Sequence, residues 1–121
     1  MRKIVITVLL SAMCLLAGDV SGKWSGSFKP TGHEDHSHDL YIIFKQEGDR
    51  LSGSGGPNES KQHPMQNGKV EGDRLTFEVP AGKGTFIFDL RSTGDELSGD
   101  LQFKGEGETR TAKVSLKRAG S

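Results

Sequence analysis

The sequence predicts an all-β fold, an antiparallel up-and-down barrel of about eight strands. Apolar and polar residues alternate in short runs, which is typical of strands with one buried face. No stretch after Ser21 keeps the 3.6-residue period of a helix. The seventeen glycines can supply the tight turns that join short strands. At 121 residues, the chain has room for one domain.

Residues 1–18 differ from everything that follows. Arg2 and Lys3 precede an almost unbroken apolar run over residues 4–17, and small residues come after it. This is the layout of a secretory signal peptide, and the run is shorter than the roughly 20 residues that span a bilayer. We expect cleavage between Ala17 and Ser21, with an uncleaved anchor as the alternative. The β-barrel domain then covers residues 19–121, exported to the periplasm or exterior of a bacterium, with no stable membrane insertion after cleavage.

Cys14 is the only cysteine, and it lies inside this apolar run. A bacterial lipoprotein would need a small residue before the modified cysteine, whereas Met13 stands here, so lipidation is the less favoured alternative. Residues 19–121 contain no cysteine and therefore no disulfide, although exported proteins often use them. The hydrophobic core must stabilise the domain unaided.

A short motif that begins with Gly-Asp organises the rest of the chain. Glycine allows a positive φ and aspartate bonds to nearby backbone amides, so the pair is typical of a tight turn. In each copy a leucine follows and begins a new alternating run. We predict three equivalent hairpin turns at one end of the barrel. The three copies are residues 48–52, 72–76 and 94–98.

The strands follow from these turns and from the alternation between them. They are expected at residues 23–29, 40–46, 51–55, 65–71, 75–79, 85–91, 97–103 and 111–118. The segments at 30–39, 56–64, 80–84 and 104–108 are expected to be loops at the opposite end from the Gly-Asp turns. The predicted inward-facing set is Trp24, Phe28, Ile42, Phe44, Phe77, Phe86, Phe88, Leu90, Leu101, Phe103, Val114 and Leu116.

The dipeptide Asn67-Gly68 leaves one alternative open, because Asn-Gly is itself a strong hairpin signal. A turn there would split the strand expected at residues 65–71 and change the strand count. We favour a single strand, because the three Gly-Asp turns then lie at the same end of the sheet.

Charge and motif content exclude several classes of function. Sixteen Lys and Arg residues balance sixteen Asp and Glu residues, and no stretch combines basic with aromatic residues as a nucleic-acid surface does. Residues 19–121 contain no cysteine nucleophile and no Gly-x-Ser-x-Gly elbow. Glu34 and Asp35 are adjacent rather than opposed across a cleft, as glycosidase carboxylates would be. We therefore expect neither a nucleic-acid partner nor an enzymatic activity.

Three histidines stand close together in the loop at residues 33–39. They are His33, His36 and His38, with acidic residues between them, and the topology places His63 at the same end. Imidazole and carboxylate groups bind Zn²⁺, Ni²⁺ or Cu²⁺, so these four histidines are a candidate metal site. A solvated loop without a defined ligand set is the favoured alternative, because the spacing suits a flexible chelate and no supporting shell can be named. We thus expect no cofactor, with Zn, Ni or Cu as the candidates if metal binds.

Gly22-Lys23-Trp24 at the start of the first strand and Arg118 near the end of the last resemble the calycin superfamily, which includes lipocalins, fatty-acid-binding proteins and avidins. The resemblance covers about residues 20–118 and implies the barrel architecture, with neighbouring first and last strands and the arginine over the indole face in a cation–π contact. No binding residue of a particular family can be carried over. Residues 21–26 and 67–73 are also similar to segments of a group of short exported bacterial proteins, which implies the same fold and compartment.

The interior of such a barrel holds side chains or one small ligand. The candidate pocket residues are Trp24, Phe28, Phe44, Phe77, Phe86, Phe88 and Phe103. They could line a pocket or fill the lumen, since each buried large apolar side chain contributes roughly 1.5–3 kcal/mol. The leading hypothesis is an exported, non-enzymatic binding protein for a small apolar ligand. The alternatives are a metal-binding protein, and an interaction or inhibitor module with a filled core that binds another exported protein.

Overall fold

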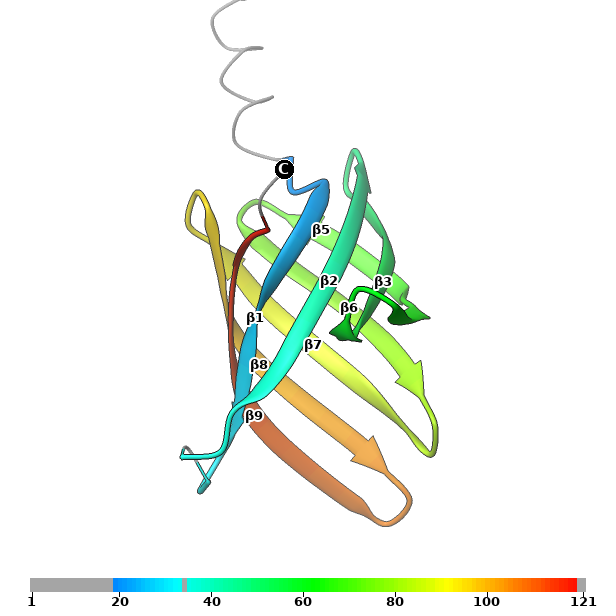
Figure 1. Ribbon diagram of the computed structural model, residues 1–121. Helices are drawn as coiled ribbons and strands as arrows, with labels where there is room; N and C mark the ends of the chain where they lie inside the picture. The colour runs from blue at the N-terminus through cyan, green and yellow to red at the C-terminus, as the bar shows by residue number, and fades with distance from the viewer. Residues whose placement is uncertain (1–18, 34, 120–121) are drawn as a thin grey trace, which may run out of the picture.

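A computed structural model describes residues 19–33 and 35–119, and every regular element in this part of the chain is a β-strand (Figure 1). The strands form one antiparallel sheet, which confirms the all-β prediction. The predicted signal peptide and Cys14 lie outside the described residues. Within those residues, no helix is long and apolar enough to span a membrane. The strands are β1 (Gly22–Pro30), β2 (His38–Glu47), β3 (Arg50–Asn58), β4 (Lys61–Pro64), β5 (Gln66–Glu71), β6 (Arg74–Ala81), β7 (Gly84–Ser92), β8 (Glu96–Gly105) and β9 (Glu108–Arg118).

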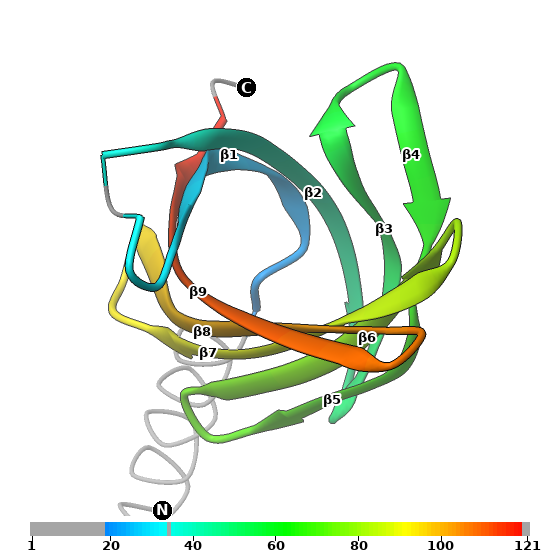
Figure 2. The ribbon, with the colours of Figure 1, turned by 90° about the horizontal axis from the view of Figure 1, so that it is seen from below.

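Eight of the nine strands close into a barrel, and β4 lies outside the ring (Figure 2). Strand β1 pairs with β2 on one side and with β9 on the other. From β9 the ring runs back through β8, β7, β6 and β5 to β3, which pairs with β2 and completes it. Closure leaves the barrel strands with few unpaired edges, as the prediction of an up-and-down barrel requires.

The three Gly-Asp motifs form the β2–β3, β5–β6 and β7–β8 hairpins, as predicted. Their glycines, Gly48, Gly72 and Gly94, all have a positive φ. Because neighbouring strands run in opposite directions, the three turns share one end of the barrel, which we call the turn end. The first and last strands also meet there, where the Ala119 N–H donates to the Lys23 carbonyl at 2.8 Å. We call the opposite end the loop end.

Asn67 and Gly68 form a bulge inside β5 and not a hairpin turn. Asn67 has a φ of 56°, a left-handed conformation that asparagine adopts more easily than most residues. The pairing of β5 with β6 shifts register between Gln66 and Lys69, as a bulge requires. The prediction of one strand in this region is therefore confirmed, and the alternative of a split strand is wrong.

The prediction of a loop over residues 56–64 is wrong, because these residues form the end of β3 and all of β4. The turn between the two strands is made by the Asn58 side chain. Its Oδ1 accepts hydrogen bonds from the backbone N–H groups of Ser60 and Lys61, each at 3.0 Å, and from the Ser60 hydroxyl at 2.8 Å. Such an Asx turn reverses the chain within a few residues. The Gly-Gly-Pro run before it had indicated a loop because both residue types are depleted in strands.

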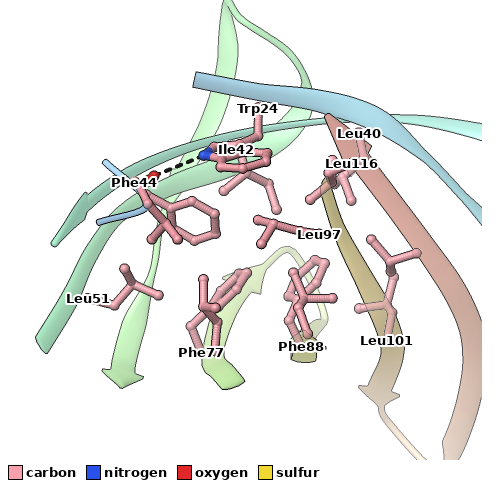
Figure 3. Packing of buried hydrophobic residues seen from close by; sticks show 14 of the residues in the cluster. Trp24, Leu40, Ile42, Phe44, Leu51, Phe77, Phe88, Leu97, Leu101 and Leu116 are labelled. Carbon is pink, nitrogen blue, oxygen red and sulfur yellow. Dashed lines mark hydrogen bonds between the residues drawn. The ribbon is translucent and has the colours of Figure 1, made fainter. Parts of the chain in front are cut away.

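Buried hydrophobic side chains form a core inside the barrel (Figure 3). Its fully buried members lie in the turn half, and Leu40, Val79, Phe88 and Leu101 extend it into the loop half. Phe77 stacks on Phe88 with ring centroids 4.6 Å apart and meets the edge of Phe44 at 5.2 Å. The predicted inward-facing set is buried, except that Phe28, Phe86 and Phe103 keep part of their surface exposed. The largest fully buried side chains are Trp24, Ile42, Leu75, Phe77, Leu90, Leu97 and Leu116.

Trp24 closes the turn end together with the segment that precedes β1. Its indole Nε1 donates to the Val20 carbonyl at 2.9 Å, and the Val20 side chain joins the core. The Arg118 guanidinium carbon lies 4.6 Å from the indole centroid, which confirms the expected cation–π contact. The same guanidinium donates to the carbonyls of Ser21 and Asp19 at 3.1 and 3.0 Å. This end of the lumen is therefore sealed by groups from both termini of the domain.

On the outer surface, Asp89 of β7 receives two hydrogen bonds from Arg74 of β6, Nε to Oδ1 at 3.0 Å and Nη2 to Oδ2 at 2.8 Å. These bonds favour the carboxylate, so the pKa of Asp89 lies below its ordinary value. A carboxyl whose pKa is lowered by folding stabilises the protein above its unfolded pKa. That contribution is lost as the pH falls through the folded pKa.

We therefore expect Asp89→Asn to lower the free energy of unfolding at pH 7, and the difference from wild type to vanish in acid, where Asp89 is protonated. The loss at neutral pH should be small, because the Arg74 and Asp89 side chains are 44% and 45% exposed. Urea denaturation across a pH series measures it. A difference that stays constant down to pH values below the folded pKa would contradict the assignment.

Candidate functional site

A cavity of about 520 Å³ occupies the loop half of the barrel, next to the packed core. Its wall is made mainly by apolar side chains from five of the barrel strands, β1, β2, β6, β7 and β8. The principal ones are Phe28, Leu40, Val79, Phe86, Phe88 and Leu101. The volume lies within the range of roughly 300–1,000 Å³ found for small-molecule sites.

A few polar groups line the same cavity, and they come from β2, β3 and β4. They are His38, Asp39, Asn58 and His63. The His38 ring stacks on Phe28 with centroids 5.1 Å apart, so an aromatic pair stands in the wall. An apolar wall with a small number of polar groups is the usual composition of a small-molecule site, in which the polar groups orient the ligand.

A second cavity of about 230 Å³ adjoins the first and shares Phe28, His38 and Phe86 with it. Phe103 and Arg110 line only the second of these two cavities. The rings of Phe86 and Phe103 lie 4.8 Å apart, so aromatic side chains separate the two spaces.

Small residues, Gly55 and Ala81 among them, contribute to the space in the loop half. A Cβ added at Gly55 would lie 3.5 Å from Val79 Cγ2 and 3.6 Å from Ile42 Cγ1, which are ordinary van der Waals distances. Gly55 is buried and has no positive φ, so neither crowding nor its backbone conformation requires glycine at this position. Its missing side chain leaves part of the cavity empty.

The structure divides the seven predicted pocket residues between the two halves of the lumen. Phe28, Phe86 and Phe88 line the larger cavity, and Phe103 lines the smaller one. The other three, Trp24, Phe44 and Phe77, belong to the packed core and line neither of these cavities. Some of the predicted phenylalanines therefore line a cavity in the loop half, and others fill the lumen in the turn half.

The four candidate histidines are distributed over two places. His38 and His63 line the larger cavity, whereas His33 and His36 stand in the exposed β1–β2 loop with ring centroids 6.1 Å apart. Across residues 19–33 and 35–119, no group of three or more His, Cys, Asp or Glu side chains is arranged to hold a metal ion. Metal binding by this loop stays a prediction.

Sequence reasoning had not placed His38 or Gly55 in a ligand cavity. His38 has the same parity as Leu40 and Ile42 along β2, and this alternation indicates that it shares their face of the strand, although its side chain is exposed. For His63 no such signal exists, because its position depends on the β3–β4 hairpin that the sequence did not predict.

Comparisons of the chain with protein-family models, with curated proteins and with solved structures find no match. The function must therefore be argued from the geometry of the barrel.

Proposed function

We propose that the protein is a non-enzymatic binding protein that holds a small apolar ligand in the loop half of its barrel. The observation that carries the proposal is the uneven filling of the lumen. One half is packed by fully buried side chains, and the other half encloses a cavity of about 520 Å³ with an apolar wall. A barrel that needed its whole lumen for stability would have large side chains at positions such as Gly55 and Ala81, which line this cavity.

The likeness to calycins supports the same proposal. A ring of eight antiparallel strands, with Trp24 of β1 opposite Arg118 of β9, is compatible with that architecture, which can hold a ligand inside the barrel. We further propose that the protein acts outside the cytoplasm of a bacterium, on the strength of the signal-peptide pattern in residues 1–18. In that compartment a protein without disulfides could carry an apolar molecule that is poorly soluble in water.

The test is titration of the protein, expressed as the full chain, with N-phenyl-1-naphthylamine, a neutral dye that fluoresces in apolar surroundings. We expect saturable binding by the wild type, and about tenfold weaker binding or worse by Gly55→Leu, whose side chain would occupy the cavity. Ser52→Leu adds the same side chain at an exposed position of the same strand and serves as the matched control.

Saturable binding that Gly55→Leu weakens and Ser52→Leu leaves unchanged supports the proposed site. Dye binding that both variants retain would place the dye elsewhere on the molecule and contradict the site. Absence of dye binding by a folded wild type would favour the interaction module with a filled core. Circular dichroism of each variant shows whether the barrel is intact.

A further inference from the structure

The barrel wall has a discontinuity beside the larger cavity, between β4 and β6. The pairing of β5 with β6 reaches the loop end only as far as Gln66 opposite Glu78. Strand β6 continues through Val79 and Pro80 to Ala81, whereas the chain before Met65 belongs to β4, which pairs with β3. Among the described strands, no ladder joins β4 to this end of β6. The β3–β4 hairpin projects beyond the ring of the other strands (Figure 2).

Two prolines explain why the ladder stops there. In an antiparallel pair, each step of two residues back along one strand is matched by two residues forward along the other. Pro64 is two residues before Gln66, and Pro80 is two residues after Glu78. If the pairing of Gln66 with Glu78 were continued, Pro64 would therefore stand directly opposite Pro80. Proline has no backbone N–H, so neither residue of that pair could donate a hydrogen bond to the other. The ladder therefore cannot be extended at the position where it would have to close the wall.

This discontinuity leads to the cavity. On one side, Pro57, Asn58 and His63 of the β3–β4 hairpin line the cavity, and on the other side Val79 and Ala81 of β6 line it. The cavity thus has its wall on both strands that fail to pair.

The open end of the barrel offers the competing route, and there the β1–β2 connection is tied to β9. The Thr31 N–H donates to the Thr111 carbonyl at 3.0 Å, and the two threonine hydroxyls are also 3.0 Å apart. These two bonds hold Thr31, at the start of this connection, against β9.

We propose that the ligand enters and leaves through the side of the barrel, between β4 and β6, and that Pro64 and Pro80 prevent this passage from closing. The inference rests on the proposed function, because it concerns access to the same cavity. It assigns to the two prolines the control of ligand exchange, while the affinity is determined by the residues that line the cavity.

The test is a disulfide bond across the passage, which can be formed and then reduced; we call this variant the lock. Pro64→Cys and Pro80→Cys, introduced together into the full chain with Cys14→Ser, would place two thiols on opposite sides of the discontinuity. Residues 64 and 80 are opposite each other in the continued register, and the disulfide forms only if the two strands approach as closely as in a paired ladder, so titration of free thiols checks its formation first. Stopped-flow mixing with N-phenyl-1-naphthylamine then gives the association and dissociation rate constants of the oxidised and reduced forms.

In the oxidised form we expect both rate constants to fall by about tenfold or more, with the Kd changed by less than about twofold, and reduction to restore them. Ser27→Cys with Ser115→Cys is the matched control, because these residues are opposite partners on the continuous part of the wall, in β1 and β9. Oxidation of this control should leave both rate constants unchanged.

Equal rate constants in the oxidised and reduced lock would overturn the side passage and favour entry at the open end. If the disulfide fails to form, Pro64→Val with Pro80→Val restores both N–H groups. The new amides of residues 64 and 80 should then exchange slowly, as amides of a paired ladder do, and dye association should become slower. Slow exchange with unchanged dye association would equally overturn the proposal. A wild type that binds no dye would instead contradict the proposed function.

Discussion

Trp24→Ala is expected to lower the free energy of unfolding by about 3–5 kcal/mol. The substitution removes the largest fully buried side chain, and with it the hydrogen bond to the Val20 carbonyl and the surface on which Arg118 lies. A domain of this size has a total stability of about 5–15 kcal/mol, so the variant should be close to unfolding at ordinary temperature. Urea denaturation followed by far-UV circular dichroism measures the loss without depending on indole fluorescence.

Two further variants separate the contributions at the turn end. Trp24→Phe keeps much of the apolar surface and loses the indole N–H, so we expect an intermediate loss of stability. Arg118→Gln leaves the core intact and removes the cation, so its loss should be the smallest of the three. A loss below about 1 kcal/mol for Trp24→Ala would show that the turn end does not depend on this side chain.

Gly26→Ala is expected to destabilise the barrel by about 2–3 kcal/mol although it adds only one methyl group. A Cβ at this position would overlap the carbonyl oxygen of Ser115 and come within 2.9 Å of the Leu116 Cα, both in the neighbouring strand β9. Backbone atoms cannot move aside as a flexible side chain would, so β1 and β9 would have to separate. Thermal or urea unfolding measures the loss.

Gly55→Ala is the matched control, because this glycine also lies inside a strand, and its added Cβ would make only ordinary contacts. Its stability should stay within about 0.5 kcal/mol of wild type or rise slightly, since alanine reduces the entropy of the unfolded chain. Equal losses in the two variants would show that the close approach of β1 to β9 is not the reason for the loss in Gly26→Ala.

The order of the barrel strands could be predicted from the sequence because the information is local. Alternation marks each strand, and each Gly-Asp motif marks a turn with its own glycine at a positive φ. The contact of Trp24 with Arg118 could also be predicted, because both residues have inward parity and closure of the barrel makes their strands neighbours.

Other features could not be predicted, because they depend on atoms that come together only in the folded chain. Strand β4 depends on the turn that the Asn58 side chain makes through its bonds to Ser60 and Lys61. The glycine and proline residues before this turn are rare in strands, so the sequence indicated a loop there. The need for glycine at residue 26 comes from the Ser115 carbonyl of β9, almost ninety positions along the sequence, so no local pattern indicates it. The larger cavity likewise depends on positions without large side chains, and a pattern of apolar residues does not indicate where space is left between them.

The division of the lumen has a consequence for how the protein can diversify. Side chains that stabilise the fold gather around Trp24 at one end, and those that would meet a ligand gather around Gly55 at the other. Leu40, Val79, Phe88 and Leu101 belong to both groups, but substitutions at Gly55 or Ala81 would alter the shape of the cavity without removing a large side chain from the core. On the proposed function, we expect the ligand specificity to change through single substitutions at such positions, each of which leaves a protein that still folds.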